Sequence, residues 1–364
     1  MAVHTRVKLS RIMQIGKTLV AILIAVLLSE LLTRIHNRDW VFRRDPSKKP
    51  QSSRFYDFEK ISQLEPHLNC DYLTQEFWQE MQSLTKDRSG IKMTNNSGDR
   101  YLVAKNCTGE FFSVADNLRT TLFAPSFSQH NYYLFGSSTL HNFEVPDSMT
   151  TASNLQKLFS KYGYDLSVQN YGVSGATIEN NFARMQVIEN VFRQGDIIVI
   201  LFGINDVGLD TYPHYEIHIL KIIRRLGEFS LVMRTIHRQL ARNSWKNHSR
   251  NTARQKVRLL QDINTWVVSK NIKFYAILEP VLHLKRNPNQ YELELRKTFG
   301  QKLEILYKFG YHEFISLLNP NFAASTTDAF NDLNTSVFLD QAHINSVGTE
   351  ILAAEIFKLT APSL

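Results

Sequence analysis

The chain has 364 residues, of which 43% are apolar and 21% charged. That length allows one large or two ordinary domains, and the composition excludes a low-complexity or disordered chain. The net charge of +8 is uneven, because residues 1–50 carry ten Lys/Arg against three Asp/Glu and residues 213–258 carry eleven against two. This distribution favours an anionic membrane or anionic polymer as partner, and since no nucleic-acid-binding motif accompanies it, we expect no nucleic acid partner.

The first predicted element is a membrane-spanning helix near the N-terminus. Residues 12–32 are predominantly apolar and follow several Lys and Arg residues, and their number is close to the roughly 20 that cross a bilayer. The apolar stretch ends in Leu27–Leu32 without the small residues of a signal-peptide cleavage site. We therefore predict an uncleaved, single-pass signal anchor within residues 1–37, with a buried amphipathic helix as the alternative. Positive residues flank both ends of the stretch, so charge does not fix its orientation.

Residues 38–130 are predicted to form a polar, basic tether followed by a small β-rich elaboration. A turn is predicted at Asn95–Asp99, where the sequence reads Asn-Asn-Ser-Gly-Asp. The two cysteines of the chain, Cys70 and Cys107, both lie in this region. The sequence leaves open whether they form a disulfide or remain two buried thiols.

From Tyr132 onward, apolar runs alternate with amphipathic segments. Such alternation predicts a parallel, doubly wound α/β sheet, in which ligands bind at the carboxyl ends of the strands. A long, basic, helical insertion at 213–250 interrupts the pattern. The predicted strands are 132–135, 166–171, 196–202 and 272–278, with 311–317 as a candidate fifth. The predicted helices lie near 150–162, 178–193, 253–269, 293–309 and 348–359.

Four short patches carry the residue types that acyl transfer through a serine requires. They are Phe135–Thr139, Asn170–Gly175, Gly203–Asp206 and Asp340–His343, and each of the first three follows a predicted strand. Acyl transfer needs a nucleophile, a base, a group that orients the base, and donors for the oxyanion. Each patch alone has an ordinary explanation as a helix cap or a turn. Their joint occurrence in this order is what indicates a catalytic centre.

Each candidate residue has a role that its chemistry suggests. Ser138 follows a strand and a glycine, where its hydroxyl could be exposed, and Ser137 is the competing nucleophile. The second patch offers a glycine N–H to the oxyanion, and the side-chain amide of Asn205 offers another donor without a charge. Asp340 and His343, three residues apart, could converge on one serine as orienting carboxylate and base.

Taken together, the four patches resemble the sequence blocks of the SGNH hydrolases, the GDSL-type esterase and lipase superfamily, over residues 131–359. The resemblance implies a flavodoxin-like, three-layer α/β/α fold. It also implies that Ser138 is the nucleophile of a triad with Asp340 and His343, and that Ser138, Gly175 and Asn205 form the oxyanion hole. The chain departs from the family at Ser137, where an aspartate is usual. That aspartate is not a triad member, so the departure leaves the mechanism intact.

We therefore expect a membrane-anchored serine esterase or deacylase whose catalytic domain, residues 131–364, faces away from the cytoplasm. Its substrate would be an O-acyl ester, such as an acetyl ester, of a glycan or a lipid. Two alternatives remain: an O-acyltransferase that uses the same residues, and a non-catalytic protein of the same fold that binds glycans or assists assembly. No cofactor is expected, and His214 and His218 lack a third metal ligand at motif spacing. Residues 213–258 could contact an anionic polymer or lipid headgroups, or form a solvated helical surface.

Overall fold

The computed structural model describes residues 58–68, 70–84, 91–207 and 231–363. The predicted anchor and the pair His214 and His218 lie outside these residues. Within the described part of the chain, no helix is both long enough and apolar enough to cross a membrane.

The chain divides into two compact units. The first comprises residues 1–49 and 213–244, and the second comprises residues 50–212 and 245–364. The described part of the first unit is a stretch of helix α9 (Leu231–Val268). The second unit contains the sheet and all of the candidate site residues.

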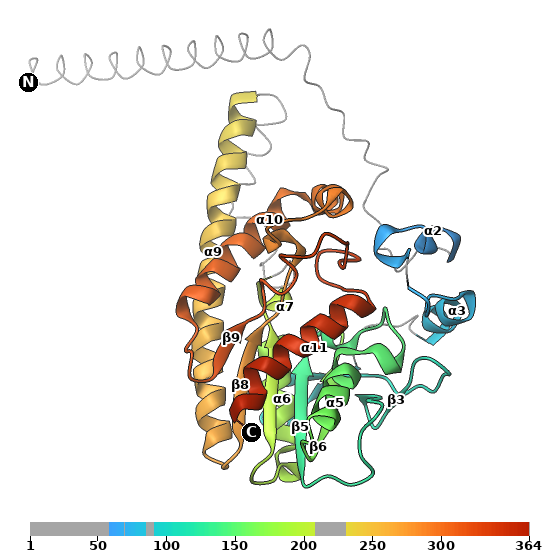
Figure 1. The fold of residues 1–364 in the computed structure, drawn as a ribbon. Coiled ribbons are helices and arrows are strands. Elements are labelled where there is room, and N and C mark those ends of the chain that lie inside the picture. Colours follow the sequence, from blue (N-terminus) through green and yellow to red (C-terminus); the bar gives the residue numbers. More distant parts are fainter. Residues whose placement is uncertain (1–57, 69, 85–90, 208–230, 364) are drawn as a thin grey trace, which may run out of the picture. The chain divides into compact units, whose positions relative to one another are not determined.

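A seven-stranded mixed sheet forms the centre of the second unit, with strand order β3-β4-β6-β5-β7-β8-β9 (Figure 1). Strands β5 to β9 pair in parallel, whereas the short β3–β4 hairpin joins β6 in the antiparallel direction. The predicted parallel sheet is therefore confirmed from β5 to β9, and the antiparallel edge was not predicted. The chain order of the parallel strands reverses between β5 and β7, and in doubly wound sheets ligands bind at such a switch point. The strands are β3 (Val114–Ala115), β4 (Leu118–Arg119), β5 (His130–Gly136), β6 (Leu166–Gly172), β7 (Ile197–Phe202), β8 (Lys273–Leu278) and β9 (Ala323–Ser325).

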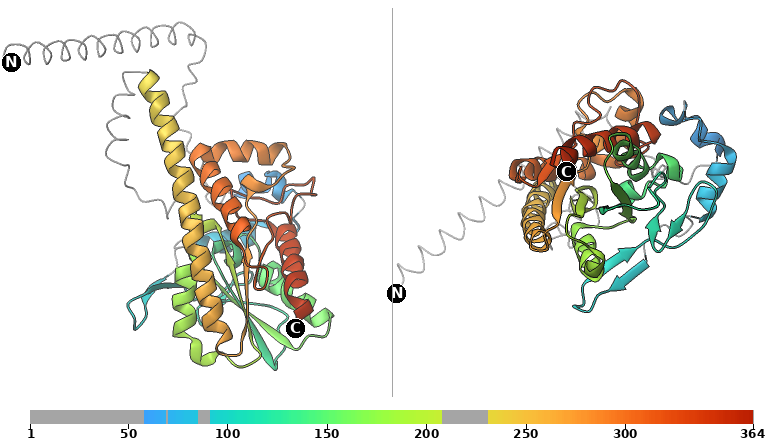
Figure 2. Two further views of the ribbon diagram at one scale, coloured as in Figure 1. Left: turned by 90° about the vertical axis from the view of Figure 1, so that its left-hand side faces the viewer. Right: turned by 60° about the horizontal axis from the view of Figure 1, so that its bottom comes forward.

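Helices cover both faces of this sheet (Figures 1 and 2). Along β5, Tyr132 and Leu134 belong to one hydrophobic core, and Tyr133 and Phe135 belong to the other. Every residue of β7 is buried, as expected for a strand covered on both faces. One core is closed by α5 (Thr151–Lys161) and α11 (Ser346–Thr360), and the other by α6 (Ile178–Val187), α10 (Gln290–Leu317) and α9.

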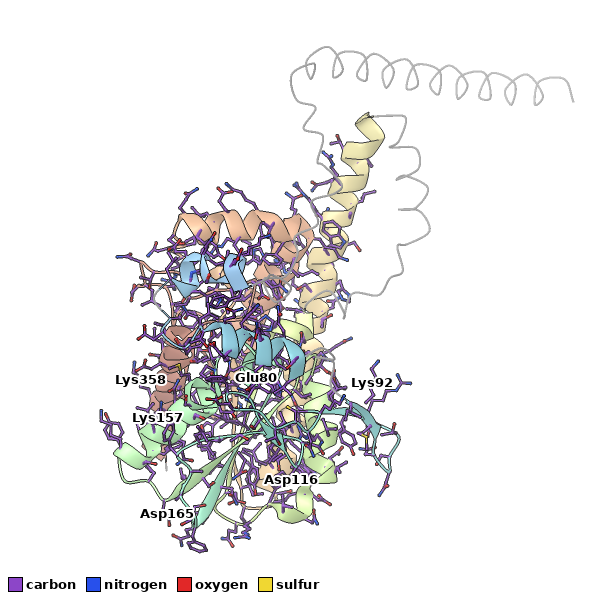
Figure 3. The ribbon with its side chains drawn as sticks, turned by 90° about the vertical axis from the view of Figure 1, so that its right-hand side faces the viewer. Glu80, Lys92, Asp116, Lys157, Asp165 and Lys358 are labelled. Carbon is purple, nitrogen blue, oxygen red and sulfur yellow. The ribbon has the colours of Figure 1, made fainter. Side chains whose placement is uncertain are left out.

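The segment before β5 is only partly β-structured. Helices α2 (Phe58–Ser62) and α3 (Gln75–Leu84) open it, with the 3-10 turn η2 (Glu65–His67) between them. The predicted turn at Asn95–Asp99 is confirmed as the turn of the hairpin β1 (Ile91–Thr94) and β2 (Arg100–Val103). The carboxylate of Glu80 on α3 (Figure 3) accepts three consecutive backbone N–H groups of residues 110–112, which ties this helix to the chain before β3.

Both cysteines in this segment are free thiols. Cys70 packs beside the core of α2 and α3, and Cys107 packs beside a separate apolar cluster. Of the two alternatives left open by the sequence, the structure contains the unpaired thiols.

Two predicted elements differ from the structure. The candidate strand 311–317 was wrong, because these residues form the end of α10, whose helical geometry is interrupted only at Gly300. Tyr307, Tyr311 and Phe314 are buried at spacings of four and three, which is a helical pattern. The fifth parallel strand is instead β9. The basic segment from 231 onward and the predicted helix 253–269 are one continuous helix, α9.

Candidate active site

The turn after β5 presents two serines with different roles. Ser137 is the N-cap of the short helix α4 (Ser138–His141), and its Oγ accepts the backbone N–H of Thr139 at 3.5 Å. Ser137 Oγ also shares a hydrogen bond of 2.9 Å with Thr139 Oγ1. Ser138 is the first residue of the helix, and its side chain does not cap the helix. The capping function therefore belongs to Ser137, which leaves Ser138 as the candidate nucleophile.

The candidate acid and base lie in a tight turn before α11. Asp340 Oδ1 accepts the backbone N–H groups of Ala342 at 2.9 Å and His343 at 2.8 Å. Leu339 N donates to His343 O at 2.8 Å, which closes the turn. The other carboxylate oxygen of Asp340 lies 2.7 Å from His343 Nδ1. One carboxylate thus fixes both the turn and the imidazole ring.

These two segments, 205 residues apart in sequence, meet at the carboxyl ends of the strands. His343 Nε2 lies 2.8 Å from Ser138 Oγ. When Nδ1–H donates to Asp340, Nε2 is the acceptor and can take the proton of the serine hydroxyl. All three residues are buried, with 7% to 9% of their surface exposed. The geometry is that of a serine, a base and an orienting carboxylate joined in series.

Strand register and a glycine bring α4 to its position. Gly136 and Gly172 are paired at the ends of β5 and β6, and His141 Nδ1 lies 2.9 Å from Gly172 O. A Cβ atom at residue 172 would lie 2.6 Å from the backbone nitrogen of His141. Only glycine lets the backbone of α4 approach so closely. Gly172 therefore allows α4, which begins at Ser138, to pack closely against the end of β6.

The two remaining oxyanion candidates lie together after β6 and β7. Gly175 has φ of +82°, in a turn closed by Ala176 N donating to Val173 O. The side-chain amide of Asn205, on α7 (Ile204–Val207), donates to Ala176 O at 3.0 Å. The amide has a second N–H, which a ligand could use. Among the described residues, no hydrogen bond joins Ser138 to Gly175 or Asn205.

Asp206 holds the start of α7 and the start of α6 together. Its Oδ2 accepts the N–H of Gly203 at 2.8 Å, and its Oδ1 accepts the N–H of Ile178 at 2.9 Å. Lys256 Nζ lies 3.6 Å from Oδ1. Burial raises the pKa of Asp206, while Lys256 and the two N–H donors act against that increase. Asp206 therefore fixes the loop that carries Asn205.

The sequence reasoning missed Glu279 and Thr139. Glu279 directly follows β8, at the same end of the sheet as the other candidates, and its Oε2 accepts a hydrogen bond from Thr139 Oγ1. Burial, with a smaller contribution from Asp206, raises the pKa of Glu279 to about 8, although the bond from Thr139 opposes this. The available signal was an acidic residue immediately after a buried strand.

A separate cleft of about 620 Å³ lies elsewhere in the second unit. It is lined by the turn of the β1–β2 hairpin, by the end of α6 and by Trp266 of α9. None of the candidate catalytic residues lines it.

Comparisons with known proteins found structural likeness alone. No protein-family model matches the sequence, and no curated protein matches it either. A member of the lipolytic protein G-D-S-L family from Veillonella parvula has 10% identity and a TM-score of 0.40, over 64% of this chain and 98% of its own. A lipase/acylhydrolase from Enterococcus faecalis has 18% identity and a TM-score of 0.38, over 63% and 94%. An acetyl xylan esterase, AlAXEase, has 14% identity and a TM-score of 0.35, over 63% and 99%. The chemistry of this chain has to be derived from its own side chains.

Proposed function

We propose that this chain is a serine esterase or deacylase of the SGNH type that acts on O-acyl esters, with Ser138, His343 and Asp340 as its triad. The observation that carries the proposal is the continuous series of hydrogen bonds from Asp340 Oδ2 through both ring nitrogens of His343 to Ser138 Oγ. A capping or turn function accounts for Ser137 and for Asp340 Oδ1, but it does not require an imidazole on Ser138. Nucleophilic catalysis by a serine requires an adjacent general base, and the imidazole supplies one.

The proposed reaction proceeds in two halves. Ser138 Oγ attacks the ester carbonyl while His343 Nε2 takes its proton, and the resulting imidazolium is stabilised by Asp340. His343 then returns the proton to the leaving alcohol, which departs and leaves an acyl-serine. Water attacks this acyl group with His343 again as base, and the carboxylic acid and free serine are released. The N–H groups of Ser138 and Gly175 and the amide of Asn205 are the proposed donors to each oxyanion.

The proposal is tested by active-site labelling. A fluorophosphonate probe reacts with a serine only when that serine is activated, so we expect it to label the wild type and not Ser138→Ala. Ser137→Ala is the comparison variant, because it removes the neighbouring hydroxyl and leaves the three triad residues in place; it should still be labelled, at a reduced rate because the bonds of Ser137 Oγ to Thr139 are lost. Labelling of Ser138→Ala to the wild-type extent, or no labelling of any of the three, would refute the assignment.

We propose an O-acyl ester of a glycan or a lipid, such as an acetyl ester, as the substrate. Hydrolysis rates on p-nitrophenyl acetate and on longer p-nitrophenyl esters measure the acyl length that the site accepts. Transfer to a sugar hydroxyl would use the same acyl-serine, so the same assay with added sugar separates the hydrolase from the acyltransferase. A decrease in acid release with a matching gain of acylated sugar would identify the transferase.

The membrane and charge assignments are also proposals. Residues 12–32 would anchor the protein, with the catalytic domain outside the cytoplasm. Alkaline carbonate extraction tests the anchor, because a spanning protein stays in the membrane fraction. Within residues 213–258, Arg250 and Arg254 on α9 share the single carboxylate of Glu313, which leaves an excess of positive charge for an anionic polymer or headgroups.

A further inference from the structure

A buried carboxyl group lies beneath the turn that carries Ser138. Glu279 is 1% exposed and follows β8 directly, and its backbone N–H donates to Phe202 O at 3.0 Å. This bond continues the β7–β8 pairing past the ends of the strands. It places Glu279 beside Phe202, the last residue of β7. Gly203 follows Phe202, and α7, the helix that carries Asn205, begins at the next residue.

In the part of the chain that the structure describes, the carboxyl group has one hydrogen-bond partner. Oε2 accepts from Thr139 Oγ1, and Oε1 makes no hydrogen bond among the described residues. An unsatisfied buried oxygen is uncommon in native structures and calls for an explanation. A buried carboxylate with no cation and only one donor would be more costly than a neutral carboxylic acid in the same place.

Two other titratable groups interact with Glu279, Asp206 and Tyr311, and Lys256 pairs with Asp206. Asp206 on α7 adds a like charge, and Lys256 on α9 is directed at Asp206 and Glu179 and does not offset the charge of Glu279. Tyr311 on α10 is fully buried, and its hydroxyl makes no hydrogen bond in the described part of the chain. The neutral form of Glu279 is therefore favoured by burial and by Asp206 together.

The contact with Thr139 connects Glu279 to both residues that flank Ser138. Thr139 follows Ser138, and its hydroxyl and its backbone N–H both bond to Ser137 Oγ on the other side. Glu279, Thr139 and Ser137 therefore form one hydrogen-bonded series around the candidate nucleophile. A shift at either end of this series would move the hydroxyl of Ser138 relative to His343.

We propose that Glu279 is a positioning residue, which holds the Ser137–Thr139 turn so that the Ser138 hydroxyl faces His343, and that it does so as a neutral carboxylic acid. The inference rests on the proposed function, since the turn matters only if Ser138 is the nucleophile. Burial raises the pKa of Glu279 to about 8, so the acid is protonated at neutral pH. Above that value a second negative charge would appear beside Asp206, close to where the oxyanion forms, and would oppose it.

The test is a pH profile of kcat and KM on p-nitrophenyl acetate for the whole chain. In the wild type we expect kcat to fall by about tenfold per pH unit above pH 8, as one essential proton is lost. Glu279→Gln is the matched variant, because the amide keeps the size and the hydrogen bond but cannot ionise. Relative to its own kcat at pH 7, this variant should lose the alkaline decline. An unchanged alkaline decline in Glu279→Gln would overturn the proposal.

A second pair of variants tests the connection through Thr139. Thr139→Val removes the hydroxyl at nearly constant shape and should lower kcat by about tenfold with KM unchanged. Thr139→Ser restores the hydroxyl and should restore kcat. Equal kcat in Thr139→Val and the wild type would overturn the proposal even if Glu279→Gln did not fold.

Protein stability gives a readout that does not depend on activity. A carboxyl whose pKa is raised on folding stabilises the protein fully below its unfolded pKa, near 4.5, and this contribution is lost as pH rises toward 8. The melting temperature of the wild type should therefore fall relative to that of Glu279→Gln over this range. A constant difference would contradict the proposal. Fluorophosphonate labelling separates the two hypotheses, because an unlabelled wild type refutes the esterase itself, whereas a labelled wild type with a flat temperature difference refutes only the role of Glu279.

Discussion

Two buried acids, one at each end of the sheet, show how differently the two ends use polar groups. Asp196 lies immediately before β7 and is fully buried. Its two oxygens accept the backbone N–H groups of Asn131 at 2.8 Å and Arg193 at 2.7 Å. Glu279 lies immediately after β8 and is equally buried, but among the residues described by the structure it has one hydrogen-bond partner and one oxygen without a partner. At the amino end, both oxygens of Asp196 thus accept backbone N–H groups. At the carboxyl end, only one oxygen of the similarly buried Glu279 has a partner among the described residues.

The difference extends to the neighbouring groups. At the amino end, Tyr132 Oη donates to Thr360 Oγ1, which in turn donates to Ile356 O, so the series ends on the backbone. At the carboxyl end, the series from Asp340 through His343 ends on the hydroxyl of Ser138, which is a nucleophile and not a structural acceptor. A serine hydroxyl that is hydrogen-bonded to an imidazole is typical of a nucleophilic site. The comparison therefore predicts that substitutions at one end affect rates and that matched substitutions at the other affect only stability.

The largest expected effect comes from the same substitution at both ends, Asp340→Asn and Asp196→Asn. At 340 the amide can keep the turn bonds of Oδ1, but its NH₂ group would face His343 Nδ1 and favour the wrong tautomer. We expect kcat on p-nitrophenyl acetate to fall by about 10³–10⁴-fold. At 196 the amide can satisfy only one of two N–H groups, which should cost about 1–3 kcal/mol of stability and leave kcat unchanged.

Steady-state kinetics and urea unfolding of the two variants distinguish these outcomes. A kcat loss of the same size in Asp196→Asn would show that the ends are not independent. An Asp340→Asn variant with wild-type kcat would remove Asp340 from the proposed triad.

A smaller effect is expected for an added methyl group at the two ends of β6. Gly172→Ala would place Cβ 2.6 Å from the backbone of His141, which cannot yield without moving α4. We expect a loss of about 1–3 kcal/mol in stability together with a lower kcat, because Ser138 moves with the helix. Gly163, before β6, has a φ of +77°, but a Cβ there would meet no atom within 4 Å, so Gly163→Ala should cost only about 1 kcal/mol and leave kcat unchanged. Equal kcat in the two variants would contradict the positioning role of Gly172.

Elements near the centre of the sheet were predictable from the sequence because burial on both faces leaves a continuous apolar run. The strand predicted at 196–202 is β7 to within one residue. The same rule failed at 311–317, since a short apolar run is alike in a strand and in a buried helix, and β9, at three residues, leaves too little pattern to detect. The β3–β4 hairpin was missed for the same reason.

The candidate site was only partly accessible to sequence reasoning. Ser138, Asn205 and His343 could be selected because each follows a strand or lies in a turn beside an acid, and their catalytic roles remain predictions. Glu279 also directly follows a predicted strand, but no second feature of the sequence marked it as part of the site. It is followed by Pro280, which suggests an ordinary loop, and its partner Thr139 is 140 residues away. Only the folded sheet shows that the ends of β5 and β8 share one polar cluster.

The smallest expected effect is that of Tyr132→Phe, at the amino end of β5. The substitution deletes one buried hydroxyl and its bond of 3.0 Å to Thr360, which can still donate to Ile356 O. We expect a loss of about 1 kcal/mol in the free energy of unfolding, measured in urea, because no buried donor is left without an acceptor. The pH profile of kcat should be unchanged, since Tyr132 faces the core of α5 and α11 while the candidate residues lie beyond the opposite ends of the strands. If the alkaline decline of kcat shifted in Tyr132→Phe, the two ends of the sheet would be electrostatically coupled through β5. The ionisation of Glu279 would then depend on more than its own neighbours.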